Sequence, residues 1–490
     1  MKTKKEQVKH EGWRTTKSER GWYFFGQVSR YGAQDLIPSY MNLFLVFNGV
    51  DLATVAIITL IVKCVDAVDD MVFGFLVDKI DLKKSKLLSR ICGEGRYLPW
   101  IRCFLLLFPI AIAFFFLMPS SLPQGAKLVW FAVTYLLYDL TYTLVDVPVQ
   151  STLMTLTDVP EERNHLITVA YIVMIGAMIG IKAIQSVLIS EQVGMPVSNM
   201  ALTFLVIYTI GMLPLMFKVK EHNAELKNVE AGKEEKYTVK EMVRALWNNK
   251  PYLIFQLCSV VPSLFATGTG ISIFVSYYLY GSSTAMVIPT LIGTAIMLIG
   301  EMCAPAISKK FELKKVRIIC SLGSIVCGFA IFFAGYRHFG TIVGLTLVSC
   351  AFAGVSTMIG AYMGPGCIEY GKYKNGRDTT GIFNAINTFF SKTTTSLASS
   401  LGLFLLSLFG WVTVNAESFA DLAAQNVQQS QSALSGLWML NSLIPAIGSL
   451  LGLIILCFYR LKDSDAKLMG MCNSGEITRE ECEARLSRKY

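Results

Sequence analysis

Apolar residues dominate the chain in long continuous stretches that are separated by short polar connections. A helix needs about 20 mostly apolar residues to cross a bilayer, and twelve stretches approach or exceed that length. They cover residues 22–48, 52–77, 101–118, 127–151, 167–190, 201–218, 252–278, 285–303, 317–335, 340–362, 382–408 and 436–460. The pattern therefore predicts an all-α membrane protein with twelve transmembrane helices.

The longest polar interruption covers residues 219–250 and separates the spans six and six. It predicts two six-helix bundles, over residues 22–218 and 251–460, an arrangement that recurs among secondary transporters. Inside the interruption, apolar side chains from Val239 to Trp247 recur at helical spacing, which indicates either an amphipathic helix at the membrane surface or a solvated linker helix. We expect residues 1–21 to form a polar tail, and residues 461–490 to form a second, mobile one.

Charge and composition support the membrane location and predict an orientation. Only 16% of the residues are charged, and the mean hydropathy is +0.50, which is too apolar for a soluble protein of this size. Lys and Arg gather in the N-terminal tail and in the connection after the second span. Because cytoplasmic loops retain positive charge, we expect an integral protein of a bacterial-type cytoplasmic membrane with both termini in the cytoplasm. The net charge of +9 then requires no nucleic-acid partner.

Several functional classes find no support in the sequence. The 12 cysteines contain no C-x-x-C pair and are expected to be reduced, structural thiols. The 4 histidines have no metal-binding spacing. Because no catalytic triad, zinc motif or Walker loop is recognisable, we expect no enzymatic activity, no cofactor and no ATP-driven transport.

The second span carries the segment VDAVDDMVFG, which places Asp66, Asp69 and Asp70 at positions i, i+3 and i+4. This spacing puts three carboxylates on one face of a helix. A charge inside hydrocarbon costs about 2.5–3.5 kcal/mol on insertion scales, so such residues are candidates for function. A bound cation or proton would relieve their mutual repulsion. The alternative is permanent neutralisation by Lys63 and other buried bases.

The fourth span contains YDLTYTLVDVPVQ, with Asp139, Thr143, Asp146 and Gln150 on one side of the helix. Hydroxyl and carboxylate oxygens suit a hard cation such as sodium, and carboxylates beside an amide can also hold sugar hydroxyls. Pro148 frees a backbone carbonyl and can kink the helix beside this stripe. Alternatively, Asp139 pairs with a base on a neighbouring helix.

Charged residues also occur in the first and eleventh spans. Arg30 and Asp35 are five residues apart in the first span, which places them on different faces of a helix. Two roles are open for Arg30, because a guanidinium can bind a substrate carboxylate or hydroxyls or pair structurally with Asp146. Lys392, in the eleventh span, could pair with the second-span aspartates when the cation leaves.

The segments VDAVDDMVFGFLVDK, TYTLVDVP, NNKPYL and IEYGKYKNGRDTTGIFNAINTFFSK follow one another along the chain. In sequence and in order they resemble the glycoside–pentoside–hexuronide:cation symporters of the major facilitator superfamily, which include the melibiose permease. The resemblance covers nearly all twelve spans and implies the major facilitator fold. It also implies uptake of a sugar-like solute that is driven by a sodium or proton gradient.

The resemblance further implies roles for individual residues. Its cation site would comprise Asp66, Asp69, Asp70 and Thr143, with Lys392 as the coupling lysine near that site. Asp146 matches the sugar-binding aspartate of the fourth helix. Asp69 departs from the melibiose permease, which has asparagine there, and a third acid makes proton coupling more plausible beside sodium coupling.

The sugar site departs further from the melibiose permease. A gapless alignment, which we prefer, puts Arg30 where that protein has a sugar-binding aspartate. A gapped alternative uses YGAQD, which ends at Asp35, and would shorten the first helix by about nine residues, too short to span the membrane comfortably. Gln150 replaces a tryptophan, and Tyr171 replaces an arginine of the fifth helix. The candidate substrate-binding residues are therefore Arg30, Asp35, Asp139, Asp146, Gln150 and Tyr171.

These observations favour a monomeric symporter that imports a sugar, glycoside or hexuronide by alternating access. An alternative is a major facilitator transporter of a non-sugar solute, such as an organic anion attracted by Arg30. A third alternative is a membrane sensor that kept the fold and lost transport, but the complete acidic stripe and the short tails argue against it.

Overall fold

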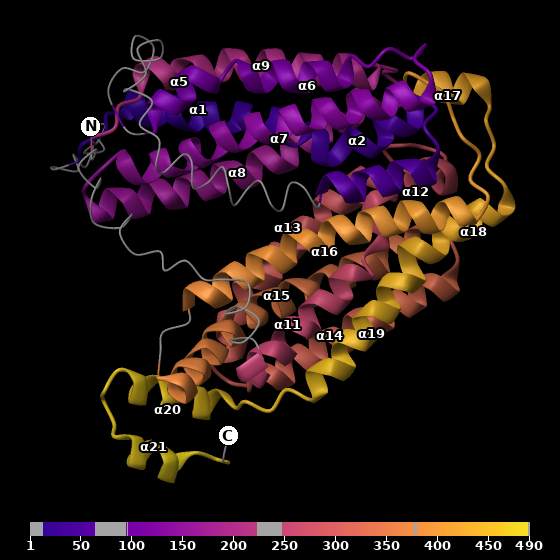
Figure 1. Cartoon of the computed structure of the whole chain (residues 1–490). Coiled ribbons are helices and arrows are strands. Elements are labelled where there is room, and N and C mark those ends of the chain that lie inside the picture. Colours follow the sequence, from indigo (N-terminus) through magenta and orange to yellow (C-terminus); the bar gives the residue numbers. More distant parts are fainter. Residues whose placement is uncertain (1–12, 64–94, 96, 223–246, 377–379, 489–490) are drawn as a thin grey trace, which may run out of the picture. The chain divides into compact units, whose positions relative to one another are not determined.

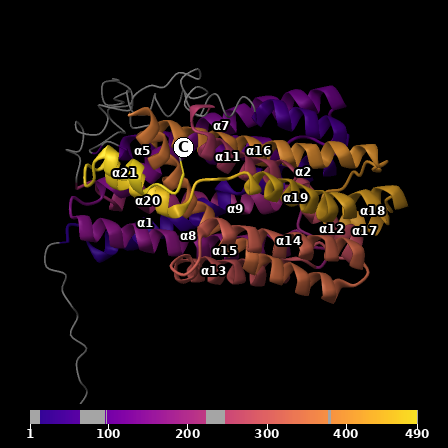
Figure 2. The ribbon, with the colours of Figure 1, turned by 90° about the horizontal axis from the view of Figure 1, so that it is seen from below.

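The computed structural model describes residues 13–63, 95, 97–222, 247–376 and 380–488 of the 490-residue chain. Within this part the backbone is helical apart from turns, connecting loops and one isolated antiparallel bridge between Asn48 and Asn415. Figures 1 and 2 show the long helices from two directions. The acids Asp66, Asp69 and Asp70 and most of the expected amphipathic helix lie outside the described residues.

The chain divides into two compact units. The first contains the described residues of Met1–Val50, Cys64–Lys233 and Asn415–Ala424. Its helices are α1 (Lys17–Gln34), α2 (Leu36–Phe47), α5 (Leu98–Phe104), α6 (Leu107–Phe116), α7 (Gln124–Thr155), α8 (Pro160–Leu188), α9 (Val197–Lys218) and most of α17 (Phe419–Gln425). Helix α1 packs against α8 and α9, and α6 packs against α7 and α9.

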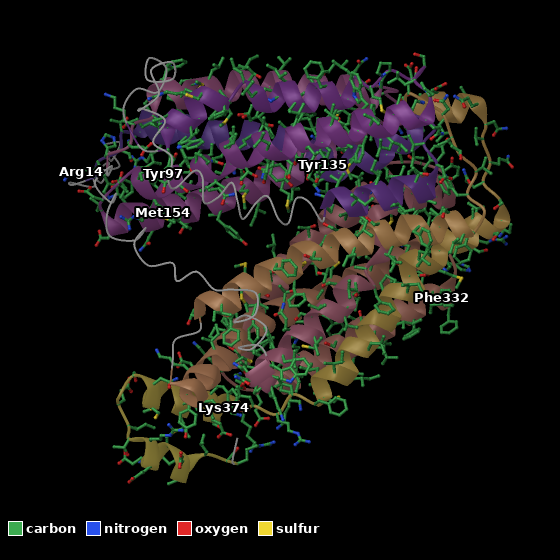
Figure 3. All side chains as sticks on the ribbon, viewed as in Figure 1. Arg14, Tyr97, Tyr135, Met154, Phe332 and Lys374 are labelled. Atoms are coloured by element: carbon green, nitrogen blue, oxygen red, sulfur yellow. The ribbon has the colours of Figure 1, made fainter. Side chains whose placement is uncertain are left out.

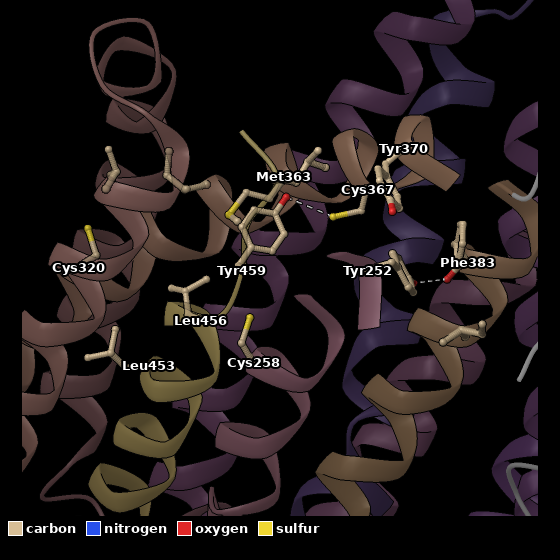
Figure 4. Close-up of a cluster of buried hydrophobic side chains, with 14 of the residues drawn as sticks. Tyr252, Cys258, Cys320, Met363, Cys367, Tyr370, Phe383, Leu453, Leu456 and Tyr459 are labelled. Atoms are coloured by element: carbon tan, nitrogen blue, oxygen red, sulfur yellow. Dashed lines mark hydrogen bonds between the residues drawn. The ribbon is translucent and has the colours of Figure 1, made fainter. Parts of the chain in front are cut away.

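The second unit contains the described residues of Asp51–Lys63, Glu234–Val414 and Gln425–Tyr490. Besides a short helix over Leu52–Lys63, its helices are α11 (Lys250–Leu264), η3 (Thr267–Gly270), α12 (Ser272–Tyr280), α13 (Val287–Ser308), α14 (Leu313–Ala334), α15 (Phe339–Asn375), α16 (Thr380–Leu408), α18 (Gln431–Trp438), η4 (Met439–Leu443), α19 (Ile444–Cys457), α20 (Asp463–Asn473) and α21 (Arg479–Arg485). Helix α15 packs against α13, α14 and α20, and α11 packs against α19. A buried cluster that includes Tyr252, Phe383 and Tyr459 forms the core of this unit (Figure 4).

The helix surfaces suit a hydrocarbon solvent. Eight described segments are long and apolar enough to cross a membrane. Many of their large apolar side chains point outward, as with Phe217, which is 72% exposed, and Met302, which is 80% exposed. The side chains on the ribbon are drawn in Figure 3. In lipid such exposure carries no hydrophobic penalty, while the helical backbone satisfies its own hydrogen bonds.

Prolines explain why several expected spans are broken into shorter helices. A proline ring clashes with the carbonyl group four residues earlier. Pro38 would oppose the carbonyl of Gln34, where α1 ends, and Pro109 would oppose that of Leu105, which follows α5. In the twelfth span, Pro445 would oppose the carbonyl of Asn441, which lies in the π-helical turn η4. Sequence therefore located these spans, and proline positions determine where each is interrupted.

The connection between the eleventh and twelfth spans joins the first unit. Its Ala416 N–H donates to the carbonyl of Phe47 at 2.9 Å, and its Glu417 carbonyl accepts from the Val197 N–H at 3.3 Å. The Phe47 and Phe419 rings meet edge to face with centroids 5.1 Å apart. The segment Asn415–Ala424 therefore completes the ends of α2 and α9, which the division into contiguous bundles did not anticipate.

The C-terminal tail is folded, and the expectation of a mobile tail was wrong. Asn473 on α20 donates to the Glu369 carboxylate at 2.6 Å, and the Leu313 N–H at the start of α14 donates to Asp463 at 2.8 Å. Met469 and Cys482 are fully buried. These contacts fasten α20 to the polar end of the second unit, so a largely polar segment folds through a few buried side chains and capped backbone groups.

The described end of the N-terminal tail is fastened to the start of α8 by the Glu162 carboxylate. This fully buried group accepts the Arg14 N–H at 2.9 Å, the Thr15 N–H at 3.1 Å, the Thr15 hydroxyl, and the Thr157 hydroxyl at 2.6 Å. Nearby, the Arg14 guanidinium forms a forked hydrogen bond with Asp158 and so lowers the pKa of that carboxyl. Helix α1 begins soon after, at a capping box formed by Thr16 and Glu19, which places its start inside the expected tail.

We predict that Glu162→Gln lowers the free energy of unfolding by about 2 kcal/mol, because a neutral amide offers one acceptor oxygen and presents an N–H group to existing donors. Thermal unfolding of the detergent-solubilised protein, followed by tryptophan fluorescence, measures the change. The matched control is Glu161→Gln, since Glu161 is exposed. Equal melting temperatures for both variants would contradict this role of Glu162.

Candidate functional site

A buried ion pair joins α1 to α7 inside the first unit. An Arg30 guanidinium nitrogen lies 2.5 Å from an Asp146 carboxylate oxygen, and each residue is only 8% exposed. Desolvating two charges is costly unless good geometry and further hydrogen bonds compensate. Of the two roles open for Arg30, the structure thus shows the pairing with Asp146, and this pairing leaves room for a ligand role as well.

Two amide side chains complete the surroundings of Asp146. Gln150, one turn further along α7, donates to the second carboxylate oxygen at 2.6 Å. Gln34, one turn beyond Arg30 on α1, donates to the first oxygen at 3.3 Å and also contacts the Tyr142 hydroxyl. The carboxylate therefore accepts from one guanidinium and two amides, which are groups that can also bind the hydroxyls of a polyol.

A small cavity of about 10 Å³ adjoins the pair. Its described lining consists of Arg30, Gln34, Phe108, Tyr142, Val145, Asp146 and Tyr208. Two buried polar groups, Arg30 Nε and the Tyr208 hydroxyl, have no hydrogen-bond partner among the described residues. A space of this size holds about one water molecule, so a larger ligand requires the surrounding helices to move apart.

Asp35 lies apart from the Arg30 pair, as its position on a different helical face predicted. It forms an ion pair with Lys182 on α8, with nitrogen and oxygen 3.3 Å apart, and accepts from the Ser39 hydroxyl at 2.8 Å. Lys182 is nearly half exposed. A substrate role for Asp35 stays a prediction.

Of the residues expected to bind the cation, the structure describes only Thr143, which lies on α7. Thr143 and Asp139 are both buried, and the Thr143 hydroxyl donates to the Asp139 carbonyl at 3.2 Å. The three second-span acids lie outside the described residues. Lys392 belongs to α16, and its side chain is likewise outside the described part. The cation site and the coupling role of Lys392 therefore stay predictions.

Tyr171 on α8 does not line the cavity beside Arg30 and is 57% exposed. Its substrate role also stays a prediction. Conversely, the sequence analysis missed Gln34, Tyr142 and Tyr208. Gln34 and Tyr142 could have been found, because each lies one helical turn from a charged residue of the pair, but nothing local in the sequence indicates Tyr208.

Comparisons with known proteins agree on a transporter family. The sequence profile of a family described as MFS/sugar transport protein matches residues 25–463. The isoprimeverose transporter of Lactiplantibacillus pentosus is 25% identical over 92% of this chain and 90% of its own length. The glucuronide carrier protein homolog of Escherichia coli (strain K12) is 23% identical over 89% of this chain and 90% of its own length.

Solved structures agree on the fold. The nucleoside transporter NupG superposes with a TM-score of 0.56 at 13% identity, covering 90% of this chain and 99% of that one. The xylose transporter XylE from E. coli gives a TM-score of 0.50 at 13% identity, covering 91% and 98%. The expected all-α architecture of the major facilitator type is thereby confirmed.

We predict that Arg30→Gln and Asp146→Asn each destabilise the protein by roughly 3–5 kcal/mol, because each leaves a buried charge without its partner. The double variant should lose less than the sum of the two single losses. Denaturant unfolding of the purified protein in micelles measures all three free energies.

The matched control is Arg479→Gln, which breaks an exposed ion pair with Glu483 and should cost at most about 1 kcal/mol. Additive losses in the double variant would contradict a direct interaction between Arg30 and Asp146.

Proposed function

Because the chain belongs to the family described as MFS/sugar transport protein, we propose that it is a secondary transporter that moves a sugar or glycoside together with a sodium ion or a proton. The proposed cycle is alternating access between two membrane-spanning units. A relative named for isoprimeverose supports this choice of solute. No cofactor beyond the coupling ion is proposed, and we propose a monomer with both termini in the cytoplasm.

The observation that carries the proposal is the Arg30–Asp146 pair, beside which Arg30 Nε and the Tyr208 hydroxyl have no hydrogen-bond partner among the described residues. A polyol could insert between the two charged groups, donate a hydroxyl to Asp146, and accept from Arg30 and the two glutamines. It would also satisfy the buried Tyr208 hydroxyl. The charges of Arg30 and Asp146 cancel, so this site favours a neutral sugar or glycoside over a hexuronide, whose carboxylate would compete with Asp146 for Arg30.

Coupling is proposed to use Asp66, Asp69, Asp70 and Thr143, as the family resemblance implies. A bound sodium ion or proton would relieve the repulsion among the three acids. Lys392 would pair with them when the cation leaves. A ligand shifts such an equilibrium only by its difference in affinity between the inward- and outward-facing states, so the bound cation is proposed to favour the state that binds the sugar.

We predict that Asp70→Asn abolishes gradient-driven accumulation, lowering it by roughly tenfold or more, because an amide cannot carry the charge that binds the cation. Radiolabelled uptake into proteoliposomes under an imposed sodium or proton gradient measures this. The matched control is Asp51→Asn, since Asp51 caps the helix over Leu52–Lys63 and asparagine caps equally well. Unimpaired accumulation in the Asp70 variant would refute the coupling role.

The substrate is identified by thermal stabilisation against a panel of neutral sugars, glycosides and uronides, each with and without sodium and at two pH values. Linkage predicts that the true substrate stabilises most when the coupling ion is present. We expect Asp146→Ala to lose this stabilisation and the calorimetric binding signal. Unchanged affinity in that variant would refute the sugar-binding role of Asp146.

A further inference from the structure

A second cavity is lined by described residues that all belong to the second unit. Its volume is about 880 Å³, and residues of α11, α14, α15, α16 and α19 line it. Cavities of roughly 300–1,000 Å³ are typical of small-molecule sites. Of the residues expected to bind the cation or the substrate, those whose side chains the structure describes do not line this cavity, so the Arg30–Asp146 site does not account for it.

Arg317 supplies the charge in this cavity. It lies on α14, where one guanidinium nitrogen donates to the Ser259 hydroxyl at 3.0 Å and the group sits 5.3 Å from the centroid of the Phe255 ring. Among the described lining residues Arg317 alone is charged, and it forms no ion pair with a described carboxylate. A half-buried guanidinium without a counter-charge favours an anion, which it can bind through two parallel hydrogen bonds.

Hydroxyl groups cover the wall around Arg317. On α14, Ser321 and Ser324 follow Arg317 by four and seven residues and so lie on the same face of the helix. Other hydroxyl groups line the cavity from α15. Those that make no hydrogen bond to another described residue are Ser321, Ser324, Ser349, Ser356 and Thr357. Such a wall offers donors and acceptors to a molecule that itself carries several hydroxyls.

Small residues on α15 create the space. Gly360, Ala361 and Gly364 line the cavity on the face that carries Ser356. A Cβ atom at Gly360 would lie 3.7 Å from the Arg317 guanidinium, so even small side chains here would begin to fill the site. The rings of Tyr252 and Phe383 close another side, where the Tyr252 hydroxyl donates to the Phe383 carbonyl at 2.7 Å (Figure 4).

We propose that this cavity binds a polyhydroxylated anion, a molecule that combines a carboxylate, sulfonate or phosphate group with several hydroxyls. Arg317 binds the anionic group and the serine wall binds the hydroxyls. A soluble sugar acid and the headgroup of phosphatidylglycerol share this chemistry. The described residues that line the site all belong to the second unit, so the inference stands independently of sugar transport through the Arg30–Asp146 site.

The test measures the dissociation constant for glucuronate on the purified, delipidated full-length protein, with glucose as the neutral probe. We expect Arg317→Gln to weaken glucuronate binding by roughly tenfold or more, the loss expected for charge-assisted hydrogen bonds. The matched control Lys315→Gln should bind as the unmodified protein does, because Lys315 is exposed and pairs with Glu312. Arg30→Gln should also retain glucuronate binding, which separates this site from the first.

The lipid source is tested in a second arm. The protein is reconstituted into nanodiscs with or without phosphatidylglycerol, and native mass spectrometry counts the lipid retained on release. Retention that is lost in Arg317→Gln but kept in Lys315→Gln assigns the site to a lipid headgroup and supports the proposal. If Arg317→Gln fails to fold, Ser356→Leu fills the cavity without removing the charge and should cause the same losses.

Two outcomes overturn the proposal. One is glucuronate binding and lipid retention that are both unchanged in Arg317→Gln or Ser356→Leu. The other is glucuronate binding that disappears in Arg30→Gln and persists in Arg317→Gln, which would place the anion in the first unit.

Discussion

A charge placed inside a hydrocarbon-embedded helix bundle must meet an opposite charge or a ligand, and this constraint shapes the functional parts of the molecule. Arg30 and Asp146 satisfy it for each other, 2.5 Å apart between α1 and α7. Asp35 satisfies it through Lys182. Arg317 has no counter-charge among the described residues, and there the same constraint points to a molecule from outside the chain.

The two cavities differ in charge balance and in size, and these differences imply different ligands. The first has a volume of only about 10 Å³, and the charges of its guanidinium and carboxylate cancel. A neutral polyol that entered this cavity would replace hydrogen bonds between Arg30 and Asp146 with its own, and it would add no net charge to the site. The second is about 880 Å³ and has a cation without a described counter-charge, so an anion gains more there than a neutral molecule would.

Several of the expected membrane spans are interrupted and consist of two or more shorter helices. Prolines stop α1 and α5 partway along expected spans, while Gly268 and Gly270 lie in the short helix η3 that follows α11. Gly402 packs against the η3 backbone, where an added Cβ would lie 2.2 Å from the Thr267 carbonyl oxygen. In membranes such breaks are tolerated where the backbone is covered by protein, as the close contact of Gly402 with Thr267 shows here.

Local sequence patterns determined the membrane-spanning helices and the helical stripe that carries Asp146 and Gln150. They also placed Arg30 and Asp35 on different faces of the first span, because helical periodicity acts over a few residues. Tertiary structure alone decided that Arg30 meets Asp146, that Lys182 meets Asp35 and that Tyr208 closes the first cavity. It also decided that Asn415–Ala424 joins the first unit, that the C-terminal helices pack, and that Arg317 faces a serine wall from another helix. These contacts join residues that are far apart in the chain. They depend on how whole helices pack, and no short sequence pattern encodes that.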